Sequence, residues 1–207
     1  MFNLNLLLMS NYRNEVTSSE RSIWKNNFAA ESGNIFDKFQ NTPIVLSKSI
    51  YEQICIKYNA HLSIYFGLDN SGNPQVIALP TYKIDELDSN NLSRAWDDIT
   101  GSDSLFELYS NKSIDINTAK TYLQNWLNNN SNHEFFIRSF IFPRTNFIQI
   151  FENQNEDYAL LDFGLKKQIK VMTQSCYVNG NPASSPIVAD YSWPCPPTCR
   201  VNSDLHL

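Results

Sequence analysis

The sequence predicts an α+β fold of two similar halves, each with the order helix–strand–helix–strand–strand, around a mostly antiparallel sheet. Segments with helical periodicity alternate with short apolar runs, several of which show strand-like alternation. In each half, two such runs flank a turn and so predict a hairpin. The same order of landmarks occurs in residues 15–82 and again in residues 116–178. Because both hairpins have apolar faces to bury, we expect residues 1–207 to form a single domain with helices packed on the sheet.

The first half begins with a helix whose two ends are marked in the sequence. Thr17 and Glu20 have the spacing of a capping box, in which each side chain accepts a hydrogen bond from the other residue's backbone amide. Apolar side chains recur at near-helical spacing up to Phe28. Gly33 follows and is expected to cap the C-terminus of this helix.

Strands and a second helix complete the first half. Residues 44–46 form a short apolar run that predicts a strand, and residues 47–59 have apolar side chains four positions apart, which predicts an amphipathic helix. Residues 61–66 alternate between apolar and polar side chains. Residues 75–82 form a second such run after a turn containing Gly72. These two runs predict a hairpin.

The second half repeats this order. The sequence predicts a helix over residues 116–130, a strongly apolar strand over 134–143, a short helix over 144–154 and two alternating strands within 158–174. A tight turn starting at Gly164 is expected to join the last two strands.

Internal duplication is our preferred explanation of the repeated order. An offset of 97 residues, which places Ile44 on Ile141, aligns the Phe-Gly-Leu triplet at residues 66–68 with the one at residues 163–165 without a gap. Any two α+β halves with alternating strands could align about as well. The paired triplets, each placed where a strand enters its turn, favour duplication.

Two regions lie outside the repeat. Residues 83–115 carry most of the acidic excess and predict a connector with one or two short helices, for which residues 92–99 are the best candidate. Residues 179–207 form a tail that contains prolines and cysteines. Prolines lower the entropy that a segment loses on ordering. We therefore expect the tail to dock on the sheet through Trp193.

The composition limits the class of function. The formal net charge is −5 and only 18% of the residues are charged, without the basic stripe that nucleic-acid binders carry. The apolar run at residues 6–9 is too short for a signal peptide, and no later run approaches the roughly 20 residues that a helix needs to cross a bilayer. We therefore expect a soluble, cytoplasmic protein with neither a nucleic-acid nor a membrane partner.

No common catalytic signature occurs in the sequence. Six scattered glycines make neither a dinucleotide-binding nor a phosphate-binding loop, and the HExxH and GxSxG motifs are absent. The candidate binding residues are Asp69 at a strand end, His61 at a strand start and Arg138 within an apolar run. Each also has a structural explanation: Asp69 suits a turn, His61 an exposed strand position and Arg138 an edge strand. Trp193 is a further candidate because it is the tryptophan of the tail.

The tail holds a pair of cysteines, Cys195 and Cys199, in the pattern C-x-x-x-C. An extended polyproline path would separate their Cα atoms by roughly 12 Å, whereas a disulfide needs about 4.4–6.8 Å. The intervening prolines must therefore turn before the two sulfur atoms can meet. A zinc site would need further ligands, for which Cys176 and His206 are the nearest in sequence. We rank a docked tail first, a redox or disulfide pair second and a metal site third.

Two stretches resemble parts of a group of small uncharacterised bacterial proteins. They are residues 67–69, GLD, at a strand end and residues 194–199, PCPPTC, in the tail. The resemblance covers much of the first half and the tail, and implies strand–helix–hairpin units in a bacterial protein. It carries no activity, cofactor or partner. The second half departs from it at Lys166, which stands where the first half has Asp69.

Three hypotheses of function follow, and we prefer the first. It is a non-enzymatic binding or protein-interaction module, with a protein or small-molecule partner bound in a groove between the halves or through the tail. The second is a thiol-based redox or zinc module that uses Cys195 and Cys199. The third is an enzyme with a dispersed site near Asp69, His61 or Arg138. No cofactor is expected, although the second hypothesis admits zinc.

Overall fold

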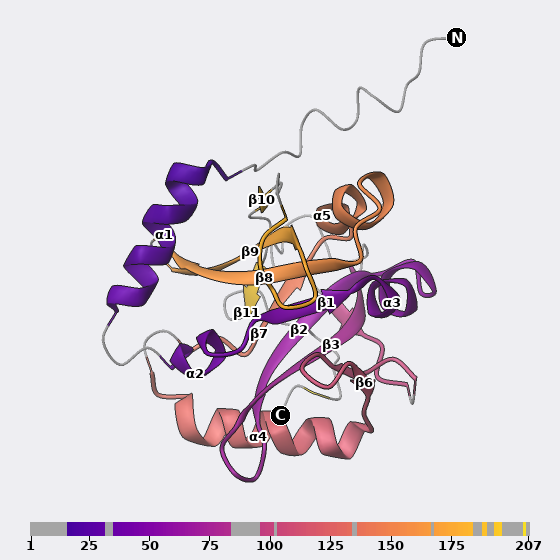
Figure 1. Cartoon of the computed structure of the whole chain (residues 1–207). Coiled ribbons are helices and arrows are strands. Elements are labelled where there is room, and N and C mark those ends of the chain that lie inside the picture. Colours follow the sequence, from indigo (N-terminus) through magenta and orange to yellow (C-terminus); the bar gives the residue numbers. More distant parts are fainter. Residues whose placement is uncertain are drawn as a thin grey trace, which may run out of the picture.

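Two antiparallel sheets that face each other across one apolar core form the centre of the molecule (Figure 1). The computed structural model describes residues 16–31, 35–83, 96–101, 103–133, 136–166, 168–183, 188–189, 193–195 and 205. Every strand pairing within these residues is antiparallel, and helices pack on the sheets. The predicted α+β class is therefore confirmed.

Two of the helical elements are long and the rest are short. They are α1 (Ser18–Ala30), α2 (Asp37–Gln40), α3 (Lys48–Tyr51), η1 (Glu52–Ile56), α4 (Ile116–Asn130), α5 (Thr145–Phe147) and η2 (Ile148–Asn153). Here η1 and η2 are π-helices, whose backbone hydrogen bonds span five residues instead of four. The helices predicted over residues 47–59 and 144–154 thus form, but each starts as a short α-helix and continues as a π-helix.

The strands form one smaller and one larger sheet. They are β1 (Ile44–Ser47), β2 (His61–Leu68), β3 (Pro74–Lys83), β4 (Trp96–Asp98), β5 (Phe106–Glu107), β6 (Lys112–Ser113), β7 (Ser139–Phe142), β8 (Tyr158–Leu165), β9 (Ile169–Cys176), β10 (Val188–Ala189) and β11 (Trp193–Cys195). The smaller sheet has the order β1-β8-β9-β10. The larger has the order β11-β7-β2-β3-β5-β6, with β4 also paired to β3. Both predicted hairpins are present, as β2–β3 and β8–β9.

The two halves of the chain exchange their first helices and first strands. β1 of the first half pairs with β8 of the second, and β7 of the second half pairs with β2 of the first. Likewise α1 packs on β8 and α4 packs on β2 (Figure 1). Because each hairpin is completed by elements of the other half, the main core contains side chains from both halves. The duplication itself stays a prediction.

The spacing between equivalent strands differs along the chain. β2 and β8 both have eight residues and start 97 residues apart. Ile44 of β1 and Phe140 of β7, by contrast, pair with equivalent positions of those two strands, although they are only 96 residues apart. The alignment of Ile44 with Ile141 is therefore wrong by one residue. The extra residue of the second half lies between β7 and β8, where residues 143–144 precede α5 while β1 leads directly into α3.

An aromatic cluster joins both sheets to both long helices. The ring centroid of Phe36, just before α2, lies 4.9 Å from that of Phe66 in β2 and 5.3 Å from that of Phe163 in β8. Trp126 reaches the same ring from α4, with a centroid distance of 5.3 Å. From α1, Phe28 stacks on Phe163, also at 5.3 Å. Since each buried aromatic side chain removes about 150–250 Å² from water, this cluster holds the layers together.

The connector is not helical where the structure describes it. Residues 96–98 form β4, which pairs with residues 81–83 of β3. Asp98 is buried there, and its Oδ2 accepts a hydrogen bond from the Tyr65 hydroxyl at 2.5 Å. The predicted helix over residues 92–99 is therefore wrong, because pairing with an open sheet edge outweighs local helix propensity. Residues 84–95 lie outside the described part of the chain.

Part of the tail adds a strand to the larger sheet. Residues 193–195 form β11, in which the backbone of Trp193 lies opposite Ile141 and that of Cys195 opposite Ser139. The predicted docking of the tail thus holds for the backbone of these three residues. Gly33, the predicted cap of α1, lies outside the described residues. Within the described ranges, no helix has the length and apolar character needed to span a membrane.

Candidate functional site

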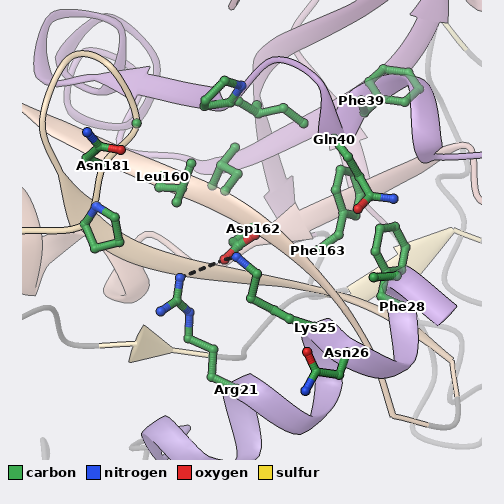
Figure 2. Close-up of a pocket in the computed structure, with 16 residues that line it drawn as sticks. Arg21, Lys25, Asn26, Phe28, Phe39, Gln40, Leu160, Asp162, Phe163 and Asn181 are labelled. Atoms are coloured by element: carbon green, nitrogen blue, oxygen red, sulfur yellow. Dashed lines mark hydrogen bonds and ion pairs between the residues drawn. The ribbon is translucent and has the colours of Figure 1, made fainter.

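One face of α1 presents two cations and an aromatic ring to the smaller sheet. The predicted capping box is confirmed: Thr17 Oγ1 accepts from the Glu20 amide at 3.2 Å, and Glu20 Oε2 accepts from the Thr17 amide at 3.0 Å. With the start of the helix set in this way, Arg21, Lys25 and Phe28 are spaced by four and three residues and lie on one face. This face is directed at β8 (Figure 2).

β8 forms the floor beneath this face. Its alternation sends Leu161 and Phe163 into the main core, so that Asp162 points the other way, towards α1. Gly164 follows on the same face as Asp162. A Cβ atom at Gly164 would lie 2.9 Å from that of Trp24, so glycine allows the helix to approach the strand closely.

Asp162 is bonded to both cations of α1. Its Oδ2 atom accepts hydrogen bonds from Arg21 Nη2 at 2.9 Å and from Lys25 Nζ at 2.8 Å (Figure 2). The exposed fraction of the side chain is 15% for Asp162, 21% for Arg21 and 44% for Lys25. Lys25 therefore lies nearer to solvent and Arg21 deeper. The Nε atom of Arg21 is buried and has no hydrogen-bond partner among the described residues.

A turn after β9 forms another wall. Gly180 has a φ of 79°, in the left-handed region that favours glycine. A Cβ atom on Gly180 would clash with the side chain of Pro43, so the turn packs directly against the residue that precedes β1. The turn is closed by hydrogen bonds from the Gly180 amide to the Tyr177 carbonyl and from the Tyr177 amide to the Asn181 carbonyl. It brings Asn181 and Pro182 to the site.

These walls border a cavity of about 450 Å³ that is open to solvent on one side. Its lining contains the charged group Arg21, Lys25 and Asp162, the amides Asn26, Gln40 and Asn181, and the apolar side chains Phe28, Phe39, Pro43, Ile44, Leu160, Leu161 and Phe163 (Figure 2). Ligand sites for small molecules are usually of this size, with apolar walls and a few polar groups. The arrangement can therefore bind a small organic molecule and orient its polar end.

The equivalent face under α4 is closed. Tyr65 of β2 occupies the position that Asp162 has in β8, and it belongs to an apolar cluster with Leu123 of α4. The space that remains between Leu123 and Leu205 is only about 10 Å³. That is the least volume able to hold one water molecule.

A second polar group lies between α3 and η2. Glu152 Oε1 accepts hydrogen bonds from the Tyr51 hydroxyl at 2.5 Å and from Arg144 Nη2 at 3.2 Å. Arg144 also donates to Asn59 Oδ1 and, through its backbone amide, to His61 Nδ1, each at 3.1 Å. The bond from Tyr51 and then that from Arg144 lower the pKa of Glu152, while burial raises the pKa of Tyr51. These groups satisfy one another, and we assign them a structural role.

Asp69 and His61 lie at opposite ends of β2 and do not share a site. Asp69 follows the strand, where its carboxylate accepts three hydrogen bonds of 2.8 Å, from the amides of Ser71 and Asn73 and from the Asn73 side chain. The side chain of Asn73 and then its amide lower the pKa of Asp69. The predicted turn role of Asp69 is confirmed. His61 begins the strand, eight residues before Asp69 and so roughly 26 Å away by the rise of an extended chain.

The Asp69 turn borders a second, more open depression of about 320 Å³. It is lined by residues 68–72 and by Asn125 and Asn129 of α4. Asn125 Nδ2 donates to the Leu68 carbonyl at 3.1 Å and to Asn70 Oδ1 at 3.3 Å. Polar side chains here bond to the turn itself, so we assign no ligand to this depression.

Arg138 belongs to neither of these places. Arg138 is half-buried just before β7, and its carbonyl accepts a hydrogen bond from the Phe66 amide at 3.2 Å. Its side chain borders the small space beside Leu205. Trp193 is in β11 at the edge of the larger sheet. Within the described part of the chain, Asp69, His61 and Arg138 therefore share no pocket, and the side chain of Trp193 lies outside that part.

Two cysteines, Cys55 in η1 and Cys176 in β9, are buried. Cys55 and Cys176 are free thiols, and burial raises the pKa of each, that of Cys176 to about 11. Such thiols are protonated at neutral pH and react slowly. Cys195 lies in β11 and Cys199 outside the described residues, so the thiol hypothesis stays a prediction. Among the residues described, no group of three or more His, Cys, Asp or Glu side chains is placed to hold a metal ion.

Sequence reasoning missed Arg21, Lys25 and Asp162. Two signals were present: the i, i+4 spacing of the cations, and a single acidic residue within the otherwise apolar run 158–165. A carboxylate on a covered strand needs a charged partner. The partners, however, lie 141 and 137 residues away in the chain, and no local pattern shows which helix covers which strand.

Comparisons with protein-family models, with curated proteins and with solved structures gave no match for this chain. The resemblance of residues 67–69 and 194–199 to uncharacterised bacterial proteins stays a prediction. Function is therefore argued from the geometry and chemistry of the site alone.

Proposed function

We propose that the protein is a non-enzymatic binding module whose ligand site is the cavity between α1 and β8. The observation that carries this proposal is the difference between a cavity of about 450 Å³ under α1 and a space of about 10 Å³ under α4. Protein interiors are normally packed as densely as organic crystals. The face under α4 is packed in this way, whereas the side chains between α1 and β8 leave a concave, solvent-accessible space in which we infer that a ligand binds.

The groups in the cavity suit binding better than catalysis. Arg21 and Lys25 are cations that orient polar or anionic groups. The amides of Asn26, Gln40 and Asn181 donate and accept hydrogen bonds without taking part in acid–base chemistry. The buried thiols of the described residues lie outside the lining. We infer a small organic ligand, held by its polar end and covered by α1.

An NMR screen of a library of small organic compounds against the full chain tests this proposal. Binders should shift the backbone amide resonances of α1, β8 and residues 180–182. Ala29→Trp places a large side chain at the edge of the cavity and should weaken binding by about tenfold or more.

Ala30→Trp is the matched control, because Ala30 is equally exposed on α1 but is not part of the lining. It should leave binding unchanged. Binders whose shifts map elsewhere, or whose affinity is the same in Ala29→Trp, would contradict the proposal.

A further inference from the structure

The charges around the cavity specify the kind of ligand that it accepts. Arg21 and Lys25 contribute two positive charges and Asp162 one negative charge, and no other charged residue belongs to the lining. The cavity therefore has an excess of one positive charge, in a chain whose formal net charge is −5. A ligand with a single negative charge would neutralise that excess.

The guanidinium of Arg21 has donor capacity that the fold does not use. Nη2 donates to Asp162 Oδ2, while Nε, on the same edge of the planar group, is buried without a hydrogen-bond partner among the described residues. This edge matches the two oxygens of a carboxylate. Asp162 accepts from only one of the two donor atoms on this edge of Arg21, and a buried N–H without a partner is unfavourable. Since Nε has almost no exposed surface, an incoming carboxylate reaches it only after the Arg21 side chain turns towards the cavity, and it then supplies the missing acceptor.

The apolar walls call for an apolar part of the ligand. Phe28 and Phe163 stack with an interplanar angle of 9° and contribute to the same wall as Phe39. Pro43 and Ile44 continue this surface. The three phenylalanines and Ile44 pack in the main core and are at most 5% exposed, so an aromatic or aliphatic body would cover the small apolar area that is left, which a bare inorganic anion would leave in contact with water.

We infer that the cavity binds a small organic monocarboxylate with an aromatic or aliphatic body, an inference that rests on the proposed function. The carboxylate bonds to Arg21, deep in the site, and is attracted by Lys25 at the solvent side. The body lies against Phe28, Phe39 and Phe163. A phosphate monoester is the poorer match, because at neutral pH it carries more negative charge than the excess in the cavity.

Titrations with phenylacetate and with its neutral counterpart phenylacetamide, followed by NMR of the full chain, test this inference. Phenylacetate should bind about tenfold more tightly than phenylacetamide and more tightly than inorganic phosphate. Arg21→Gln should weaken phenylacetate binding by about tenfold and leave phenylacetamide binding unchanged. Asp162→Asn should strengthen phenylacetate binding several-fold, because it removes the carboxylate that competes for Arg21.

A second variant keeps the test valid if Arg21→Gln fails to fold. Lys25→Gln changes a side chain that is 44% exposed and should weaken phenylacetate binding about threefold. Equal affinity for phenylacetate and phenylacetamide, or tighter binding of phosphate, would overturn the inference. If ligands shift the amide resonances of the cavity, and Ala29→Trp weakens their binding but ligand charge has no effect, the inference is overturned while the proposed function stands. If no compound of the library binds in the cavity, the proposed function is overturned.

Discussion

The two long helices cover equivalent strands in the same manner. α1 crosses β8 at Gly164 and α4 crosses β2 at Gly67, each the seventh residue of its strand. An added Cβ atom would lie 2.9 Å from the Cβ of Trp24 in the first case and 2.7 Å from that of Tyr122 in the second. The backbone plan is thus shared, and glycine sets the depth of both crossings.

The difference lies two residues earlier, at the fifth position of each strand. Tyr65 in β2 is fully buried, and its ring occupies the volume between strand and helix. Asp162 in β8 is smaller and charged, so it must be paired with cations that extend from the helix. Long cationic side chains bridge the gap without filling it. The fifth strand position, together with the helix residues that face it, therefore distinguishes a packed interface from one that contains a cavity.

The glycine crossings give the largest expected effect. Gly67→Ala should destabilise the fold by about 2–3 kcal/mol and Gly164→Ala by about 1–2 kcal/mol, as over-packing does. The Tyr122 backbone also lies 3.1 and 3.2 Å from the added atom at Gly67 and cannot yield, whereas the second neighbour of Gly164 is the flexible end of Met172, at 3.1 Å. Urea denaturation measures both changes.

Gly101→Ala is the control for this pair, because the nearest atom to its added Cβ is 4.0 Å away. We expect it to change stability by less than about 0.5 kcal/mol. If Gly67→Ala were no more destabilising than Gly101→Ala, this would contradict the idea that the close approach of each long helix to its strand depends on glycine.

The fifth strand position gives the next effect. Tyr65→Phe removes a hydroxyl that donates to the buried Asp98, and should cost about 1–3 kcal/mol. Asp162→Asn acts on partly exposed ion pairs and should cost about 1 kcal/mol or less. The cost of Asp162→Asn should shrink in 1 M salt, where the screening length is about 3 Å, and that of Tyr65→Phe should not. The same salt dependence in both variants would remove the distinction between the two faces.

The helix caps give the smallest effect, which depends on pH. Asp115 is the N-cap of α4, and the hydrogen bonds that its carboxylate accepts from the Thr118 side chain and then from the Thr118 amide lower its pKa. Hydrogen bonds with Thr17 lower the pKa of Glu20 in α1. A lowered carboxyl pKa adds stability above the usual pKa, and this is lost as pH falls through the folded-state value.

Stability should therefore decrease below about pH 4, with a larger contribution from α4, because α1 keeps the Thr17 hydroxyl as an acceptor when Glu20 is protonated. Asp115→Ser should flatten the change in urea midpoint between pH 6 and pH 3 more than Glu20→Gln does. If Glu20→Gln reduced the change in urea midpoint more than Asp115→Ser does, the larger pH-dependent contribution would belong to α1 and not to α4.

The candidate site was less predictable than the elements that form it. Each wall of the cavity follows a local rule: the capping box at Thr17 begins α1, alternation turns Asp162 away from the core, and Gly180 adopts the positive φ that its turn requires. Of the residues proposed from the sequence, Asp69 bonds to its own turn, whereas His61 accepts a hydrogen bond from the Arg144 amide, 83 residues along the chain. The turn role of Asp69 was visible in the sequence because its partners Ser71 and Asn73 lie within four residues of it.

Local sequence was sufficient for the class of fold, the two hairpins and the start of α1, because capping, turn formation and alternation depend on residues a few positions apart. It was not sufficient for the exchange that pairs β1 with β8, for β4, or for the cavity. Those features depend on which sheet edge or strand face is left uncovered when distant segments meet. Arg21 and Asp162 become partners only through that packing, since 141 residues separate them in the chain.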